Sequence, residues 1–329
     1  MKVKYLPYQP HCFAFGGFEL QMLSAFEAVR GTGTDVQKLD VWSRDNDFDV
    51  LHCWGLDIPN YDNVYWAKKN QKKVVVTALL SYYEDSYQKL RFYVSRLMYK
   101  QRIIHEMLSN IHAVTVCNDK QADICINYLK MPHSKVYVVP NIVNDKFFEL
   151  QGKTDDKGYI LIVGNVCRRK NQLNLAKACM ELNIPLVIIG KPLTGEEQYA
   201  TELAGIIEKT DKIEWIKGLP EHSDKLIEYF VNCHAVALPS FQEQQPISLL
   251  EAAVLNKPLI VADMAYARQK YYANSCLVDP ASVSSVKKGV QQVFDHTKNY
   301  LPDLDVLNAC RSANVGHAYL DVYKDISNR

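Results

Sequence analysis

Short runs of apolar, often β-branched residues recur along the chain and alternate with segments of helical pattern. Runs without alternating polar positions are typical of parallel strands that are buried on both faces. Helices are predicted between them, for example at 171–182 and 223–232. Strands that alternate with helices predict an α/β fold built on doubly wound parallel sheets. The predicted strands span residues 50–54, 73–77, 113–117, 136–140, 159–163, 185–189, 213–216, 235–238 and 258–262.

The polar segment 151–158 separates two series of predicted strands and has a glycine near each end, as interdomain linkers often do. The chain has 329 residues, which is more than one hydrophobic core usually serves. The sequence therefore predicts two Rossmann-like domains, at 1–150 and 151–309, with a C-terminal helix at about 310–329 that packs back on the first. In such sheets, ligands bind outside the carboxyl ends of the strands.

The composition excludes several classes of protein. The formal net charge of +1 gives no strong field for nucleic acid, so no nucleic-acid partner is expected. No run of about 18 apolar residues is present, so no membrane span is predicted. The nine cysteines are widely spaced and include no CxxC pair, which favours reduced thiols in a cytoplasmic protein over disulfides or a zinc site.

The segment from Pro239 to Ala253 carries the strongest chemical signal. A predicted strand ends there, a polar loop follows, and a helix is predicted to begin near Ser248. The free amides at a helix N-terminus form an anion site suited to a diphosphate. Ser248 and Glu251 have the S-x-x-E form of a capping box. Together with the loop residue Glu243, Glu251 could also accept hydrogen bonds from vicinal hydroxyls of a ribose or a sugar.

Two further segments suit the binding of phosphate. Arg168, Arg169 and Lys170 are consecutive cations in a loop that opens a predicted helix, as a phosphate clamp requires, although a solvated basic loop is the alternative. Gly16 and Gly17 would let the backbone approach a ligand closely, although paired glycines also occur in ordinary turns.

The segment around Glu243 and Glu251 resembles the E-x7-E signature of the retaining glycosyltransferases of family 4. These enzymes have the GT-B fold, in which two Rossmann-like domains face each other across a cleft. The resemblance implies that Glu243 contacts the donor sugar, that Glu251 contacts the ribose, and that the backbone of Ile247, Ser248 and Leu249 binds the diphosphate. The matching residues are Pro239, Ser240, Glu243, Leu250, Glu251, Ala252, Pro258 and Asp263.

Other loops extend this resemblance. The loop from Gly164 to Lys170 is similar to the family's G-R-x-x-x-x-K-[GN] loop, whose Arg and Lys neutralise the leaving diphosphate. Asn165 stands where the family usually has Arg, so Arg168 or Arg169 is expected to take over that role. The resemblance also assigns Gly16 and Gly17 to the family's Gly-Gly loop and Gly190 to a nucleotide-side loop.

The first domain departs from the family pattern. Family members often carry a cleft histidine after a strand of the type V-V-T-x-H, but here Thr77 is followed by Ala78 and Leu79. His52, on another predicted strand, is the candidate catalytic residue that takes its place. A buried core histidine is the alternative for that position.

The resemblance implies transfer of a sugar from a UDP- or GDP-linked donor to a glycan or lipid-linked acceptor. Transfer would retain the anomeric configuration and need neither a metal nor a separate cofactor. A catalytically silent nucleotide-sugar-binding protein and a nucleotide-sugar epimerase are the alternatives. The basic, aromatic segment 89–102 predicts contact with the inner face of an anionic membrane, with an ordinary surface helix as the alternative. The D-x-D matches at 45–49 precede a predicted strand and are interpreted as a solvated turn.

Overall fold

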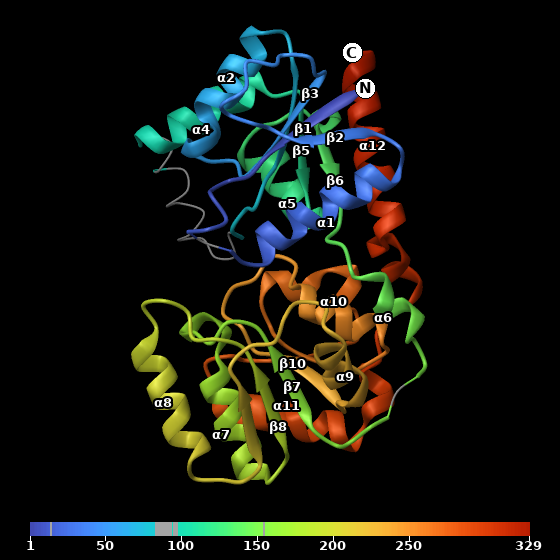
Figure 1. Cartoon of the computed structure of the whole chain (residues 1–329). Coiled ribbons are helices and arrows are strands. Elements are labelled where there is room, and N and C mark those ends of the chain that lie inside the picture. Colours follow the sequence, from blue (N-terminus) through green and yellow to red (C-terminus); the bar gives the residue numbers. More distant parts are fainter. Residues whose placement is uncertain (14, 83–93, 95–97, 154) are drawn as a thin grey trace. The chain divides into compact units, whose positions relative to one another are not determined.

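The computed structural model describes residues 1–13, 15–82, 94, 98–153 and 155–329 (Figure 1). The chain forms two compact units. The first contains Met1–Ile142 and Ala309–Arg329, and the second contains Val143–Asn308. The boundary between the units thus lies at residue 142, before the polar segment 151–158, and the C-terminal residues belong to the first unit.

The first unit is built on a parallel sheet with strand order β2-β1-β3-β4-β5-β6. Each pair of neighbouring strands is parallel, so all carboxyl ends meet at one edge of the sheet. The strands are β1 (Lys2–Leu6), β2 (Asp35–Lys38), β3 (Val50–Trp54), β4 (Lys73–Thr77), β5 (Ala113–Val116) and β6 (Val136–Val138). The order of the strands reverses direction between β1 and β3, as in a doubly wound sheet.

Helices cover both faces of this sheet, as the alternation in β3 shows. Val50 and Trp54 pack in one core with side chains of α1 (Gly17–Gly31) and α12 (Ser312–Asn328), which lie side by side (Figure 1). Leu51 and Cys53 face the opposite core, with side chains of α2 (Tyr61–Lys69) and α4 (Tyr99–Asn110). The remaining helical segments of the unit are η1 (Ile58–Asn60), α5 (Asp119–Asp123), η2 (Ile124–Tyr128) and η3 (His133–Lys135).

His52 lies in the middle of β3, and its side chain is fully buried. Its Nδ1 is 2.7 Å from the Tyr323 hydroxyl of α12, and its Nε2 is 2.7 Å from Oγ1 of Thr77. Burial lowers the pKa of His52 to about 3, so the ring is neutral at pH 7. With no exposed surface and both ring nitrogens bonded, His52 is a core residue in this structure. The candidate catalytic role is corrected in favour of the buried alternative.

The second unit repeats the architecture, with strand order β12-β11-β10-β7-β8-β9 and parallel pairing throughout. Two parallel sheets with alternating helices confirm the predicted α/β fold class. The strands are β7 (Ile160–Val163), β8 (Leu186–Ile189), β9 (Ile213–Ile216), β10 (Ala235–Leu238), β11 (Leu259–Ala262) and β12 (Cys276–Val278). The helices are α6 (Asp145–Glu149), α7 (Gln172–Leu182), α8 (Glu197–Ile207), α9 (Asp224–Asn232), α10 (Ile247–Val254) and α11 (Val283–Asp295). Shorter helical turns are η4 (Arg168–Lys170), η5 (Ala265–Arg268), η6 (Lys270–Tyr272), η7 (Thr297–Tyr300) and η8 (Asp305–Cys310).

Candidate active site

The candidate residues of the second unit gather at one edge of its sheet. Gly164 follows β7, Gly190 follows β8, and Glu243 lies in the loop after β10. Because the strands are parallel, these loops all leave the sheet at its carboxyl edge. The edge also includes a point where the strand order reverses, between β7 and β10, which is the usual place for a ligand in such sheets.

The loop from Pro239 to Pro246 is held in place by residues that follow β11. The Tyr266 hydroxyl lies 3.1 Å from the carbonyl oxygens of Leu238 and Ser240, and Tyr272 donates to the Pro246 carbonyl. Nε2 of Gln269 donates to the carbonyl oxygen of Gln244 at 2.5 Å. These supporting residues had no sequence signal, because only the fold brings η5 and η6 against this loop.

Glu243 is the centre of a charged cluster. Its Oε1 is 2.7 Å from Nη1 of Arg169 and 2.8 Å from Nζ of Lys170. The hydroxyl of Ser240 lies 2.9 Å from the same oxygen. Burial alone would raise the pKa of Glu243, but Lys170 and Arg169 outweigh it and hold the pKa below its ordinary value. The carboxylate is therefore ionised at pH 7, and two cations on one carboxylate leave the cluster with a net positive charge.

The three consecutive cations Arg168, Arg169 and Lys170 do not all reach Glu243. Arg168 points toward α8, where it lies 3.3 Å from Glu202 and 3.9 Å from Glu196. Its guanidinium also lies over the ring of Tyr199. Of the two arginines predicted to compensate for Asn165, the structure therefore brings Arg169 to the cluster and not Arg168. Asn165 itself is exposed, and its backbone carbonyl accepts a hydrogen bond from Gln172.

Gly164 and Gly190 are required by a close backbone approach. A methyl group at Gly190 would overlap the carbonyl oxygen of Gly164. Gly164 has a φ of +142°, which side-chain-bearing residues rarely adopt, and a Cβ there would lie 3.2 Å from Cε of Lys170. The two glycines thus let the loops after β7 and β8 meet and leave room for the Lys170 side chain.

Helix α10 begins at Ile247, with Pro246 as its N-cap residue and no side-chain cap. The predicted capping box is therefore wrong, because Ser248 lies inside the first turn, where its side chain does not cap the helix. Among the described residues, the amide hydrogens of Ile247 and Ser248 have no acceptor, whereas the Leu249 amide donates to the Pro246 carbonyl. Two free amides at the positive end of the helix suit an anion.

Glu251 lies on α10 and is almost completely buried. Burial raises its pKa to about 8, so the carboxyl group is mostly protonated at pH 7. Its charged-group contact in the described chain is with His222, whose Nε2 lies 4.0 Å from Oε1 of Glu251. The sequence pattern did not single out His222, because this contact joins the loop after β9 to helix α10, which are separated along the chain.

We expect Glu251→Gln to become increasingly stable relative to the natural protein between pH 4.5 and 8. The folded protein keeps the Glu251 proton in this interval, and the unfolded chain loses it above its ordinary pKa of 4.5. Stability is therefore lost as the pH rises, by about 1.4 kcal/mol per pH unit, and glutamine removes this loss. Melting temperatures at pH 5 and pH 8 test this. The exposed Glu208→Gln is the control, and a pH-independent difference for Glu251→Gln would contradict the expectation.

Gly16 and Gly17 lie at the start of α1 in the first unit. The side chain of Glu19 occupies this helix terminus, because its Oε2 accepts a hydrogen bond from the Gly16 amide at 2.9 Å. Its Oε1 accepts a second hydrogen bond from Gln9. Glu19 is a buried acid that the sequence analysis did not select, and the diphosphate role of Gly16 and Gly17 stays a prediction.

The remaining sequence candidates belong to the part of the chain before Ile142. Residues 89–93 and 95–97 of the predicted membrane-contact segment are outside the described part of the chain. Lys100, from the same segment, pairs with Asp57 at 2.6 Å. Asp45 and Asp47 pair with Lys4 and Lys2 on the amino side of β3. No helix in the described ranges has both the length and the apolar character that crossing a membrane requires.

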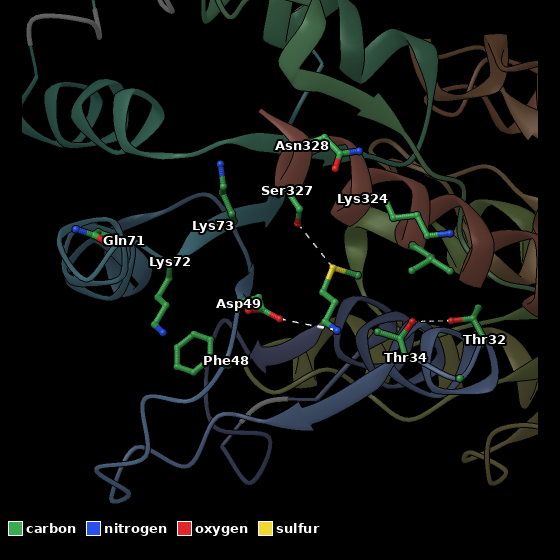
Figure 2. A pocket seen from close by; sticks show the side chains of 13 residues that line it. Thr32, Thr34, Phe48, Asp49, Gln71, Lys72, Lys73, Lys324, Ser327 and Asn328 are labelled. Atoms are coloured by element: carbon green, nitrogen blue, oxygen red, sulfur yellow. Dashed lines mark hydrogen bonds and ion pairs between the residues drawn. The ribbon is translucent and has the colours of Figure 1, made fainter.

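A surface hollow of about 810 Å³ lies in the first unit (Figure 2). Its lining includes Met1, Thr34, Asp49 and Lys73, which stand at the starts of β1, β2, β3 and β4. The hollow is therefore at the amino edge of the sheet, the edge opposite to the one where ligands of such folds bind. It is not part of the candidate site.

Comparison with known proteins agrees with this geometry. Residues 143–301 match the family model described as glycosyl transferases group 1. Over 278 residues, the chain is 23% identical to alpha-galactosylglucosyldiacylglycerol synthase of Streptococcus pneumoniae. The alignment covers 74% of this chain and 72% of that protein.

Solved structures extend the similarity over the fold of the whole chain. A glycosyltransferase from Rickettsia africae has a TM-score of 0.70 at 12% identity, covering 99% of this chain and 98% of that one. HepE from Anabaena, solved in complex with UDP, has a TM-score of 0.67 at 13% identity, covering 100% and 99%. The matched family segment contains the Glu243 cluster, and the chain is thus a glycosyltransferase of the GT-B fold whose residues 143–301 belong to glycosyl transferases group 1.

Proposed function

We propose that this glycosyltransferase moves a sugar from a UDP- or GDP-linked donor to a glycan or a lipid-linked acceptor. The observation that carries the proposal is the cluster at the carboxyl edge of the second sheet. There, Arg169 and Lys170 converge on Glu243. The loop that holds Glu243 leads directly into the free amides of α10. Such a group of donors suits a diphosphate that carries a sugar.

The cations and the helix terminus act on the leaving group. Negative charge grows on the diphosphate as the glycosidic bond breaks, so groups that bind this charge stabilise the transition state more than the ground state. Lys170 is only 12% exposed, and its interactions are therefore weakly screened by water. Arg169, Lys170 and the amides of Ile247 and Ser248 supply this stabilisation in the proposal.

The two glutamates hold the rest of the donor. Glu243 is ionised and positions the hydroxyls of the transferred sugar, and Glu251 binds the ribose. Transfer proceeds with retention of the anomeric configuration and without a resident metal ion, as the resemblance to family 4 implies.

The acceptor side of the proposal is supported by the relatives. The pneumococcal relative is named for the synthesis of a glycosylated diacylglycerol, which favours a lipid-linked acceptor here. The HepE structure contains UDP, which favours a uridine donor. A cytoplasmic enzyme that contacts a membrane surface through residues 89–102 would reach such an acceptor.

A panel of nucleoside diphosphates and their sugars tests the proposal. A ligand that binds only the folded state raises the melting temperature. UDP or GDP is expected to raise it, and ADP is expected to raise it less. Release of the nucleoside diphosphate from the matching sugar donor, with a lipid or glycan acceptor present, then measures transfer. No shift with either UDP or GDP would contradict the proposal.

Two departures, Asn165 and the absence of a histidine after Thr77, motivate the silent binding protein, and the shared two-domain architecture motivates the epimerase. The same panel separates them from a transferase. Binding of a nucleotide-sugar without hydrolysis or transfer would favour the silent protein, and a stereoisomer of the donor formed without acceptor would favour the epimerase.

A further inference from the structure

His222 occupies a strained position in the loop after β9. Its φ is +57°, a left-handed conformation that residues with side chains adopt only when the surrounding structure holds them. The next residue, Ser223, caps α9 by accepting the Leu226 amide. The loop thus fixes the backbone of His222 at the carboxyl edge of the sheet, where strain of this kind is typical of functional positions.

The His222 ring is directed at Glu251. Nε2 lies 4.0 Å from Oε1, with 27% of the His222 side chain and 7% of the Glu251 side chain exposed. This distance is too long for a hydrogen bond but short enough for a proton to pass after a small side-chain movement. Within the described residues, the Glu251 carboxyl group has no hydrogen bond, so it is a buried acid without a partner.

Both groups are neutral at pH 7 in this structure. Burial raises the pKa of Glu251 to about 8. Burial also lowers the pKa of His222, and Lys146 adds to this effect while Glu221 opposes it. A protonated carboxyl group cannot accept hydrogen bonds from two vicinal hydroxyls as a carboxylate does. Glu251 must therefore lose its proton before it can bind a ribose in this way.

The surrounding charges do not supply the missing counterion. The strands β10 and β11, which pack on α10, carry no titratable side chain. On α6, Lys146 is already paired with Asp224 at 2.9 Å. The other elements that pack on α10 are α6 and η6, whose titratable side chains are Asp145, Lys146, Glu149, Lys270, Tyr271 and Tyr272. The charges that act on His222 are those of Glu221 and Lys146.

We propose that His222 is a positioning residue of the nucleoside subsite, which accepts the proton of Glu251 when the ribose of the donor binds. The O–H bond of Glu251 breaks and an N–H bond forms at Nε2 of His222. The carboxylate then accepts from the ribose hydroxyls, and the imidazolium beside it balances its charge. No proton leaves the site. This inference rests on the proposed function, in which Glu251 binds ribose.

The test compares His222→Asn with the natural protein, because asparagine tolerates the left-handed backbone of this position. Dissociation constants for UDP and for GDP are measured by calorimetry between pH 6 and 9. Without His222 the proton must leave for solvent, so binding weakens about 10-fold per pH unit below the Glu251 pKa. We expect the variant to match the natural protein at pH 9 and to bind about 10-fold more weakly at pH 7. His296→Asn, outside the site, is the control and should bind normally.

Two further measurements separate this role from a structural one. With the 2′,3′-dideoxy nucleoside diphosphate, which lacks the ribose hydroxyls, His222→Asn should bind as the natural protein does at every pH. In buffers of different ionisation enthalpy, the variant should release about one proton per bound nucleotide at pH 7, and the natural protein should release far less.

Three results would overturn the inference. Equal affinities of His222→Asn and the natural protein from pH 6 to 9 would reject it while leaving the proposed function intact. A deficit that persists with the dideoxy nucleotide would show that His222 acts on the loop or on another part of the ligand. Failure of both UDP and GDP to bind the natural protein would reject the inference together with the proposed function.

Discussion

Lys170→Met is expected to lower kcat by about 100- to 1000-fold, the effect of removing one preorganised donor from a developing negative charge. The ammonium group lies 2.8 Å from Glu243, where the proposal places the diphosphate and the transferred sugar. Arg169 keeps a contact with the same carboxylate, so the fold should survive the change. Initial rates at saturating donor give kcat, and melting temperatures show whether the fold is retained.

Two matched variants sharpen this experiment. Lys209→Met removes an exposed lysine of the same unit and should leave kcat unchanged. Lys170→Arg keeps the charge but not the geometry of the ammonium group, and it should recover part of the lost rate. A normal kcat in Lys170→Met would remove the diphosphate role from this residue.

Glu243→Gln is expected to reduce kcat/KM by about 100-fold or more, because the proposed sugar contact requires a carboxylate. It should also lower the free energy of unfolding by about 1–3 kcal/mol, since Lys170 and Arg169 lose the negative charge with which both of them pair. Affinity for the free nucleoside diphosphate should not fall, because the cations that bind it are released from Glu243. Transfer kinetics, calorimetry with UDP and GDP, and urea unfolding give the three readouts.

The combination of results identifies the role of Glu243. Loss of turnover together with retained nucleotide affinity would place Glu243 at the transferred sugar. Equal loss of both would show that the substitution had disturbed the loop as a whole. Glu202→Gln is the control. It removes an acid of α8 that pairs with Arg168, outside the Glu243 cluster, and it should leave turnover and nucleotide affinity unchanged.

The structural contacts of the two glutamates are the reverse of those expected from the sequence. From the sequence, Glu251 had a structural alternative as the partner in a helix cap, and Glu243 had only a solvated loop as its alternative. In the structure, Glu243 carries the ion pairs, and within the described residues the Glu251 carboxyl group makes neither a cap nor a hydrogen bond. Both substitutions therefore change stability, Glu243→Gln through the loss of ion pairs and Glu251→Gln in a pH-dependent way, so melting temperatures must accompany each binding test.

Most strands in the middle of each sheet could be predicted because they are continuous apolar runs, whereas β1 was not selected, since Lys2 and Lys4 interrupt its apolar residues. The predictions for β3, β4, β9 and β10 agree with the structure at both ends. The edge strands β2 and β12 were not selected, although the edge strands β6 and β9 were. In β2 a single buried position stands among exposed ones. One such position gives no periodicity.

The positions of the site loops could also be predicted, because parallel strands bring their carboxyl ends together. The directions of individual side chains could not. Arg168 and Arg169 are adjacent in one helical turn, yet one faces α8 and the other faces Glu243. Spacing along a sequence does not determine which of two neighbours points into a site. The approach of His222 to Glu251 depends on the strand order and had no local signal.

The helix α12 makes the first unit discontinuous along the chain, with the whole second unit inserted before it. Its side chains complete the core around Tyr5 and His52, where Tyr323 reaches both residues. During synthesis, every residue of the second unit is added before residues 312–328. Until those residues are made, the first unit has α1 but not α12 on this face of its sheet, and His52 lacks its Tyr323 partner. The first unit, although its sequence comes first, therefore cannot complete its core until the end of the chain has been made.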